Sequence, residues 1–445
     1  MLKYKSSRRV LTVCVTFITL FSLLFSAVPL TPTRAAGPLT FTILHTNDFH
    51  GQLEEVIASP GTSSNPGMAR VATIVNNVRT AVGADNVLLV DGGDEMQGSL
   101  LSNLQKGLPT IEVFKKMGYD VATFGNHEFD WGQTVLAERT AQAATEAPDT
   151  SAFPYVTANI VQKDAADCKD AGWTPPTFAT GGAYQIVTVG TAPTIVKVAF
   201  IGVTTAETPT ITIASATEGL CFKDPADSIV HYYDEMKAAG AEVIVVLSHL
   251  GFTDGGYGYG ISVYGDQTLA AKLNTASKPV NLIIGGHSHT NLSAATTVGT
   301  TVVAQAHYNG RKVGRADITV GADGAVSVAW SRLWVCAANN NGTADCPTTT
   351  PEDATIKALI TTYSSDPDYQ ELINTEIGWT NIPIVREYNG DSLMGYFIND
   401  AVYENLNNDT STVNDVDMVF NNPGGLRADI TCVDYPCMIN YGMMF

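Results

Sequence analysis

Residues 41–50 read FTILHTNDFH, a short apolar run that ends in two polar residues, Asp48 and His50. A run of this length, rich in aromatic and β-branched residues, predicts a buried β-strand. Similar runs recur downstream and alternate with amphipathic segments. We expect strands at 87–90, 121–124, 196–203, 243–247 and 282–284, and helices at 69–82, 110–116, 133–144, 228–239 and 267–274. Short apolar strands alternating with helices predict an α/β domain built in layers. From 301 to 334 strands dominate, so we expect a β-rich closing sheet there.

Polar side chains follow five of these strands at their carboxyl ends. They are Asp48 and His50 after the first strand, Asp94 in VDGGDEMQGS, Asn126 in FGNHEFD, His249 in VIVVLSHLG, and His287 with His289 in LIIGGHSH. In open α/β sheets this edge is where ligands bind. Residues i and i+2 of an extended segment face the same side, so we expect Asp48 and His50 to reach one ion. His287 and His289 have the same spacing.

These seven residues offer oxygen and nitrogen donors without sulfur, which suits Zn, Mn, Fe, Co or Mg. Any one of them alone is more often a strand-end cap or a core histidine. Their joint placement favours a metal site instead. Seven ligands exceed the number that one tetrahedral ion needs. The pattern therefore predicts two divalent ions that share a bridging carboxylate.

The blocks TNDFHG, GGDEMQGS, GNHEFD, LSHLG and GGHSH occur in this order between residues 46 and 289. In sequence and order they resemble the 5′-nucleotidase/UDP-sugar hydrolase family. A sixth block, NNPGGLRADI at 421–430, is similar to part of that family's substrate-binding domain. The resemblance implies a calcineurin-like metallophosphoesterase domain at 37–350, a layered β-sandwich flanked by helices. A connecting helix at 351–373 and a smaller, incomplete α/β C-terminal domain at 374–445 would follow.

The resemblance also assigns roles to individual residues. The first ion would bind Asp48, His50, Asp94 and His289, and the second would share Asp94 and add Asn126, His249 and His287. The family often has glutamine where this chain has His289. His127 and Asp130 match the family's catalytic pair. Asn422 and Arg427 match its substrate-binding block, and Arg386 is a candidate for a second substrate arginine. Glu95 and Glu128 match no ligand position, and we expect both to be solvated.

The expected reaction is removal of phosphate from nucleoside 5′-monophosphates. Two dications lower the pKa of bound water far enough to provide hydroxide near neutral pH, and the hydroxide attacks phosphorus. His127 would stabilise charge or assist the leaving oxygen. Two alternatives use the same metal centre: cleavage of 2′,3′-cyclic nucleotides with 3′-nucleotidase activity, and hydrolysis of nucleotide-sugar pyrophosphates. A non-catalytic secreted ligand-binding protein is the alternative from another class.

The N-terminal segment predicts export. Residues 1–9 are basic, residues 10–30 are almost wholly apolar, and a segment with small residues follows at 33–35, as in a secretory signal peptide. An uncleaved membrane anchor is the rival interpretation of residues 1–36. No later segment is apolar enough to span a membrane, so we expect a secreted, periplasmic or cell-surface protein that is soluble once the signal is removed.

Charge and cysteine content bear on partners and on compartment. The chain has 25 Lys and Arg against 44 Asp and Glu, and five of the cations but none of the acids lie in the first 36 residues. Such an acidic chain repels nucleic acid polymers, whereas a small phosphate ester can still bind beside metal ions. The oligomeric state stays open. Beyond the signal segment six cysteines remain, which suggests disulfides outside the cytosol. Cys336–Cys346 and Cys432–Cys437 close most easily and leave Cys168–Cys221, although other pairings are open.

Overall fold

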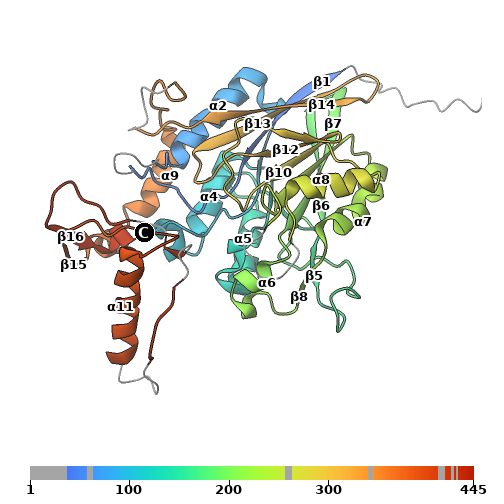
Figure 1. Cartoon of the computed structure of the whole chain (residues 1–445). Coiled ribbons are helices and arrows are strands. Elements are labelled where there is room, and N and C mark those ends of the chain that lie inside the picture. Colours follow the sequence, from blue (N-terminus) through green and yellow to red (C-terminus); the bar gives the residue numbers. More distant parts are fainter. Residues whose placement is uncertain are drawn as a thin grey trace, which may run out of the picture.

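The computed structural model describes residues 38–57, 64–255, 263–338, 344–408, 416–421, 425–426 and 429–444. The predicted signal segment at 1–36 lies outside them. Between residues 38 and 338 the chain forms two sheets packed face to face, with helices on both outer faces (Figure 1). The predicted layered β-sandwich flanked by helices is therefore confirmed.

The first sheet combines a parallel half with an antiparallel edge. Its order is β14 (Val326–Trp334), β13 (Lys312–Val320), β1 (Leu39–Thr46), β2 (Val87–Asp91), β3 (Val121–Thr123) and β4 (Tyr155–Val156). Strands β1 to β4 run parallel to one another, whereas β13 pairs antiparallel with both β1 and β14. The carboxyl ends of β1, β2 and β3 therefore lie at one edge.

The second sheet has a parallel centre of four strands. Its order is β11 (Thr296–Val298), β12 (Thr301–Gln305), β10 (Leu282–Gly285), β9 (Val243–His249), β7 (Thr194–Thr204) and β6 (Tyr184–Thr191). The outer strands β11 and β6 are antiparallel to their neighbours. A separate pair, β5 (Ile160–Gln162) and β8 (Leu220–Phe222), lies apart from both sheets.

Residues 301–334 do not form a sheet of their own, so that expectation was wrong. Strand β12 joins the second sheet in parallel to β10, whereas β13 and β14 extend the first sheet beside β1. Strands β12 and β13 bury most of their residues by joining an existing apolar sheet, whereas β14 forms a partly exposed edge.

Helices cover the outer faces of both sheets. They are α2 (Met68–Val82), α3 (Leu100–Leu104), α4 (Leu108–Met117) and α5 (Gly132–Ala143) on the side of the first sheet, and α7 (Pro225–Ala238) and α8 (Asp266–Thr275) in the second half of the chain. The short helix α6 (Thr208–Ile211) lies between β7 and β8 in the chain. The buried residues of α2 and α4 pack on the first sheet, and those of α7 and α8 pack on the second.

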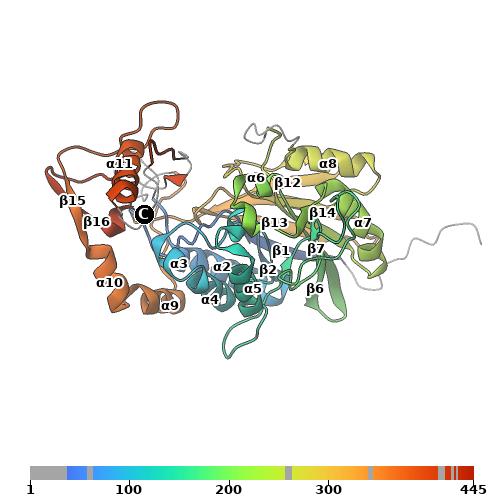
Figure 2. The same cartoon turned by 90° about the horizontal axis from the view of Figure 1, so that it is seen from below.

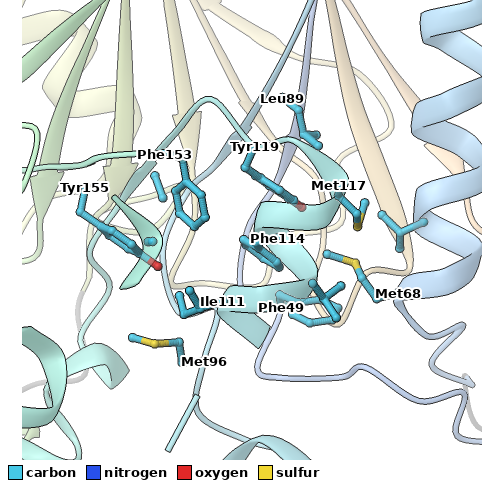
Figure 3. Packing of buried hydrophobic residues seen from close by; sticks show 14 of the residues in the cluster. Phe49, Met68, Leu89, Met96, Ile111, Phe114, Met117, Tyr119, Phe153 and Tyr155 are labelled. Carbon is cyan, nitrogen blue, oxygen red and sulfur yellow. The ribbon is translucent and has the colours of Figure 1, made fainter. Parts of the chain in front are cut away.

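Alternate residues of each strand enter different cores. Phe41 and Ile43 of β1 face the layer between the sheets, where they meet Phe200 of β7, while Leu44 enters the core beneath the helices. That outer core holds an aromatic cluster in which Phe114 stacks on Tyr119 with ring centroids 4.0 Å apart (Figure 3). Because these strands are buried on both faces, their sequences read as continuous apolar runs.

The segment after residue 350 begins with two capped helices. In α9 (Ala354–Ser364) the Asp353 carboxylate accepts N–H bonds from the first turn, and Asp366 does the same for α10 (Pro367–Asn374). Ile356 and Ile360 of α9 pack into the core beside α2 and α4.

A smaller unit follows α10 and lies beside the sandwich in both views (Figures 1 and 2). It contains β15 (Glu376–Thr380), α11 (Leu393–Asn408) and β16 (Cys437–Asn440), and β15 pairs antiparallel with β16. Its core is small and is centred on Met394, Leu426, Ile430 and Ile439.

Three disulfides connect the six cysteines, with the pairing that sequence proximity favoured. They are Cys168–Cys221, Cys336–Cys346 and Cys432–Cys437. Across the described residues, every helix is too short or too polar to cross a membrane.

Candidate metal centre

The seven predicted ligands lie where the carboxyl ends of the two sheets meet. Asp48, His50, Asp94 and Asn126 follow β1, β2 and β3 of the first sheet, and His249, His287 and His289 come from β9 and β10 of the second. Neither sheet alone supplies the set. The sandwich therefore joins residues that are more than 200 positions apart in the chain.

The side chains gather in two groups. Asp48, His50 and His289 form one and Asp94, His249 and His287 the other, with the ligand atoms of each group within 4.8 Å of one another. Asn126 joins the second group, because its Oδ1 atom lies 2.9 Å from Nδ1 of His287. The groups adjoin each other, since Nε2 of His249 is 3.9 Å from Oδ1 of Asp48. Two groups of candidate metal ligands thus lie side by side.

The spacing argument assumed an extended backbone at these residues, but the backbone is not extended there. Five of the seven adopt the left-handed conformation: Asp48 (φ 51°), His50 (φ 52°), Asp94 (φ 58°), His287 (φ 72°) and His289 (φ 52°). Non-glycine residues rarely adopt positive φ, and such strain concentrates at functional sites. Asp48 and His50 do meet in one group, but through tight turns, and His287 and His289 fall in different groups.

Hydrogen bonds fix which histidine nitrogens face the centre. Nδ1 of His249 donates to the Gly92 carbonyl at 2.8 Å, and Nδ1 of His50 donates to the Gln97 carbonyl at 2.9 Å. A carbonyl only accepts, so Nε2 of each neutral ring carries a lone pair.

These lone pairs point at other acceptors. Nε2 of His249 lies 3.0 Å from Oδ2 of Asp94, is buried, and has no hydrogen-bond partner among the described residues. Nε2 of His50 lies 3.0 Å from Nε2 of His289. Convergent lone pairs on buried nitrogen and oxygen atoms are stabilised by a cation between them. The donor set therefore fits divalent metal ions.

The electrostatics of the metal-free pocket show the same requirement for positive charge. Burial disfavours a charged imidazole, yet the carboxylates of Asp94 and Asp48 outweigh it and raise the pKa of His249 to about 10. Burial raises the pKa of Asp48 to about 7, against the opposing attraction of His249. Buried acids and imidazoles in this arrangement bind either protons or metal ions, and the two compete.

Glu128 and Glu95 are buried, so the expectation that both are solvated was wrong. Glu128 is 1% exposed, and its carboxylate accepts the backbone N–H of Asp94 at 2.8 Å and of Gly125 at 2.7 Å. It thereby fixes the loops after β2 and β3 against each other. Glu95 is fully buried and accepts the Tyr155 hydroxyl. A carboxylate bound by several N–H groups avoids the cost of an unpaired buried charge.

A glycine permits this close approach. A Cβ atom on Gly125 would lie 2.0 Å from Oδ1 of Asp94, so any side chain at this position would displace the carboxylate. The GNHEFD block therefore requires glycine at its first position on steric grounds.

The predicted catalytic pair lies beside the two groups. Nδ1 of His127 is 2.7 Å from Oδ2 of Asp130, and both side chains are 26% exposed, so solvent reaches them. The backbone N–H of His127 donates to Oδ1 of Asp94 at 2.9 Å, and its ring lies 5.4 Å from that of His50. This pair is thus anchored to the same carboxylate that serves the second group.

Two neighbours of the ligand groups were missed from the sequence. Glu207, 1% exposed, places Oε1 3.1 Å from Nε2 of His287. Tyr308 stacks on His289 with centroids 4.6 Å apart and planes 16° apart. Neither follows a motif strand, and only the polar TTAETP stretch after β7, at 204–209, offered a signal.

The predicted substrate-binding residues Asn422 and Arg427 lie outside the described residues. Arg386 is described, and it pairs with Asp429 through Nε at 3.0 Å and donates Nη1 to the Leu426 carbonyl at 3.0 Å.

Comparison with known proteins identifies the family of the chain. Residues 41–291 match the calcineurin-like phosphoesterase family. The chain is 29% identical over 421 residues to snake venom 5′-nucleotidase of Naja atra, covering 88% of this chain and 70% of that protein. It is 30% identical to the 5′-nucleotidase of Bos taurus, covering 89% and 66%. A 5′-nucleotidase precursor from Thermus thermophilus superposes with a TM-score of 0.65 at 27% identity, covering 91% of this chain and 73% of that one. The chain thus spans about two thirds of the length of these relatives.

Proposed function

Since the chain belongs to the calcineurin-like phosphoesterase family, we propose that it releases phosphate from nucleoside 5′-monophosphates. The observation that carries this proposal is the pair of adjacent ligand groups with the His127–Asp130 pair beside them. The relatives named as 5′-nucleotidases support the nucleotide as substrate. The family itself is one of phosphoric ester hydrolases.

In this proposal two divalent ions bind in the two groups. Asp48, His50 and His289 would hold one ion, Asn126, His249 and His287 would hold the other, and Asp94 would contact both. Two such ions supply a strong nucleophile from water near neutral pH and offset charge on the phosphate. Asp48 and Asp94 bring two negative charges against four positive ones, so the loaded pocket attracts a phosphate ester despite the acidic chain.

His127 acts on the phosphate directly. Asp130 accepts the proton of Nδ1, which orients the ring. Nε2 is then the nitrogen that donates to a phosphoryl oxygen or to the leaving oxygen of the nucleoside. Its backbone bond to Asp94 keeps the imidazole at a fixed position relative to the ions. A general acid of this kind typically contributes about 10²–10⁴-fold to the rate.

We also propose a function for each part of the chain. Residues 37–350 hold the metal centre, residues 351–373 connect, and residues 374–445 contribute to nucleotide binding through Asn422 and Arg427. An arginine suits this role because its planar guanidinium binds phosphate with two parallel hydrogen bonds.

A location outside the cytosol belongs to the same proposal. Three disulfides are typical of secreted, periplasmic or cell-surface proteins, and a signal segment at 1–36 agrees with that compartment. One of the relatives is a venom enzyme.

The test is hydrolysis by residues 37–445, stripped of metal and reloaded with Mn²⁺ or Zn²⁺, with the nucleotide products separated and free phosphate measured. The substrates are AMP, 2′,3′-cyclic AMP, UDP-glucose and an aryl phosphate, and the control is the Asp94→Ala variant. We expect metal-dependent turnover with preference for AMP, and none in the variant. Preference for the cyclic nucleotide or for UDP-glucose would move the assignment to those reactions. Bound metal without turnover of any ester would contradict hydrolysis.

A further inference from the structure

We infer that Glu207 is a positioning residue that holds His287 in the orientation required to bind the second metal ion. The inference rests on the metal centre of the proposed function and adds a residue to it. Glu207 precedes α6 and matches none of the motif blocks. Its carboxylate is nevertheless buried at 1% exposure, with Oε1 3.1 Å from Nε2 of His287.

The orientation of the His287 ring differs from that of His249 and His50. Those two rings use Nε2 toward the centre and bind a backbone carbonyl through Nδ1. In His287 the roles are reversed: Nδ1 lies 2.9 Å from Oδ1 of Asn126, inside the second group, and Nε2 points away toward Glu207. The Glu207 carboxylate is thus the group that makes Nε2 the protonated nitrogen and Nδ1 the ligand.

A carboxylate does this more strongly than a carbonyl. It accepts the Nε2–H proton with a full negative charge, which raises the basicity of Nδ1 and limits rotation of the ring. The His287 side chain is only 10% exposed, so water has little access to its ring. The backbone around Glu207 is itself fixed, since its carbonyl accepts both the N–H and the hydroxyl of Thr210 at 2.7 Å.

The chain offers matched variants for a test. Glu207→Ala removes the acceptor, and Glu207→Gln keeps a neutral acceptor oxygen of the same reach. Thr210→Val removes a hydroxyl bond to the Glu207 carbonyl in the same turn but leaves the carboxylate in place. Thr210 is exposed and contacts no candidate ligand. A loss confined to the Glu207 variants therefore reports on the carboxylate.

The experiment is titration of the metal-stripped protein with Mn²⁺ by calorimetry, resolving two sites, with circular dichroism to confirm folding. We expect Glu207→Ala to weaken one site by about 10–100-fold and to leave the other unchanged. Glu207→Gln should weaken the same site less, and Thr210→Val should match the wild type. Combining Glu207→Ala with His287→Ala should cause no loss beyond that of His287→Ala, because both changes act through one ligand.

Three results would overturn the inference: equal loss at both sites, additive losses in the double variant, or wild-type affinity in Glu207→Ala. If Glu207→Ala fails to fold, the metal affinities of Glu207→Gln and Thr210→Val are compared instead. Weaker binding at one site in Glu207→Gln alone supports the inference, and equal affinities overturn it. The readout is metal affinity and not turnover. A wild-type chain that binds two ions but hydrolyses no nucleotide would contradict the proposed function and leave the role of Glu207 standing.

Discussion

The imidazole of His127 and the carboxylate of Asp130 form a hydrogen bond of 2.7 Å, three residues apart on the turn that follows β3. Because Asp130 fixes the ring, loss of either residue should affect turnover more than metal binding. We expect His127→Ala to lower kcat for AMP by about 10²–10⁴-fold with metal content retained. Asp130→Asn should give an intermediate rate. Steady-state kinetics and metal analysis check this, and an unchanged kcat in His127→Ala would remove the residue from catalysis.

We expect His289 to influence the metal preference of the first group, because it offers an imidazole nitrogen where the family resemblance implies an amide oxygen. The His289→Gln variant should keep two ions but bind Zn²⁺ less well relative to Mn²⁺, by about tenfold, since imidazole suits Zn and oxygen donors suit Mn. Competition titration of the two metals measures the ratio. A Zn²⁺-to-Mn²⁺ affinity ratio equal to that of the wild type would show that His289 does not determine the metal preference.

Glu128 is expected to stabilise the loops that carry Asp94 and Asn126. Its carboxylate accepts N–H groups from the loops after β2 and β3 and has little access to water. Glu128→Gln turns one acceptor oxygen into a donor and leaves a buried N–H without its partner. A penalty of about 1–3 kcal/mol in the free energy of unfolding follows. Urea denaturation of the metal-free protein tests this, with Glu138→Gln on the surface of α5 as the control. Equal stability of the two variants would speak against the loop-fixing role.

His45 should make folding sensitive to acid. The ring is fully buried in β1, accepts the Trp330 indole N–H at 3.0 Å, and burial lowers its pKa to about 3 from 6.5. The unfolded chain therefore binds a proton that the folded chain does not. This contribution to stability is complete above pH 6.5 and falls as the pH drops from 6.5 toward 3. At pH 5 the loss amounts to about 2 kcal/mol.

The His45→Gln variant isolates this effect, because glutamine keeps an acceptor for Trp330 but does not titrate. Unfolding free energies of both proteins should be compared at pH 7.5 and pH 5. We expect the wild type to lose about 2 kcal/mol more than the variant between these values. Parallel pH profiles would show that His45 does not carry the acid sensitivity.

Much of the fold was readable because its strands are buried on both faces. The apolar runs at 41–45, 87–90 and 243–247 mark β1, β2 and β9 to within a few residues. Strand β6 was missed because it lies at a sheet edge where most side chains are only partly buried, so its sequence lacks a continuous apolar run. Which sheet the strands of residues 301–334 join depends on pairing with strands that are distant in sequence, and no local sequence pattern specifies that pairing.

The ligand positions were readable for a different reason: each polar residue interrupts an apolar strand at its end. Residues that support the ligands do not stand at the end of an apolar run, so the sequence does not single them out. Glu128 and Glu207 look like solvated acids in sequence, and only the fold shows that backbone N–H groups and a histidine surround them. The strained turns at Asp48 and His50 were likewise invisible, because positive φ is imposed by hydrogen bonds between loops that are far apart in sequence.

The central claim is that the two ligand groups bind two adjacent divalent ions. Crystals of residues 37–445 grown with Mn²⁺ or Zn²⁺ test it through anomalous difference density at the absorption edge of the metal. The account predicts two peaks, one among Asp48, His50 and His289 and one among Asn126, His249 and His287, with Asp94 in contact with both. A single peak, or peaks elsewhere on the protein, would contradict it.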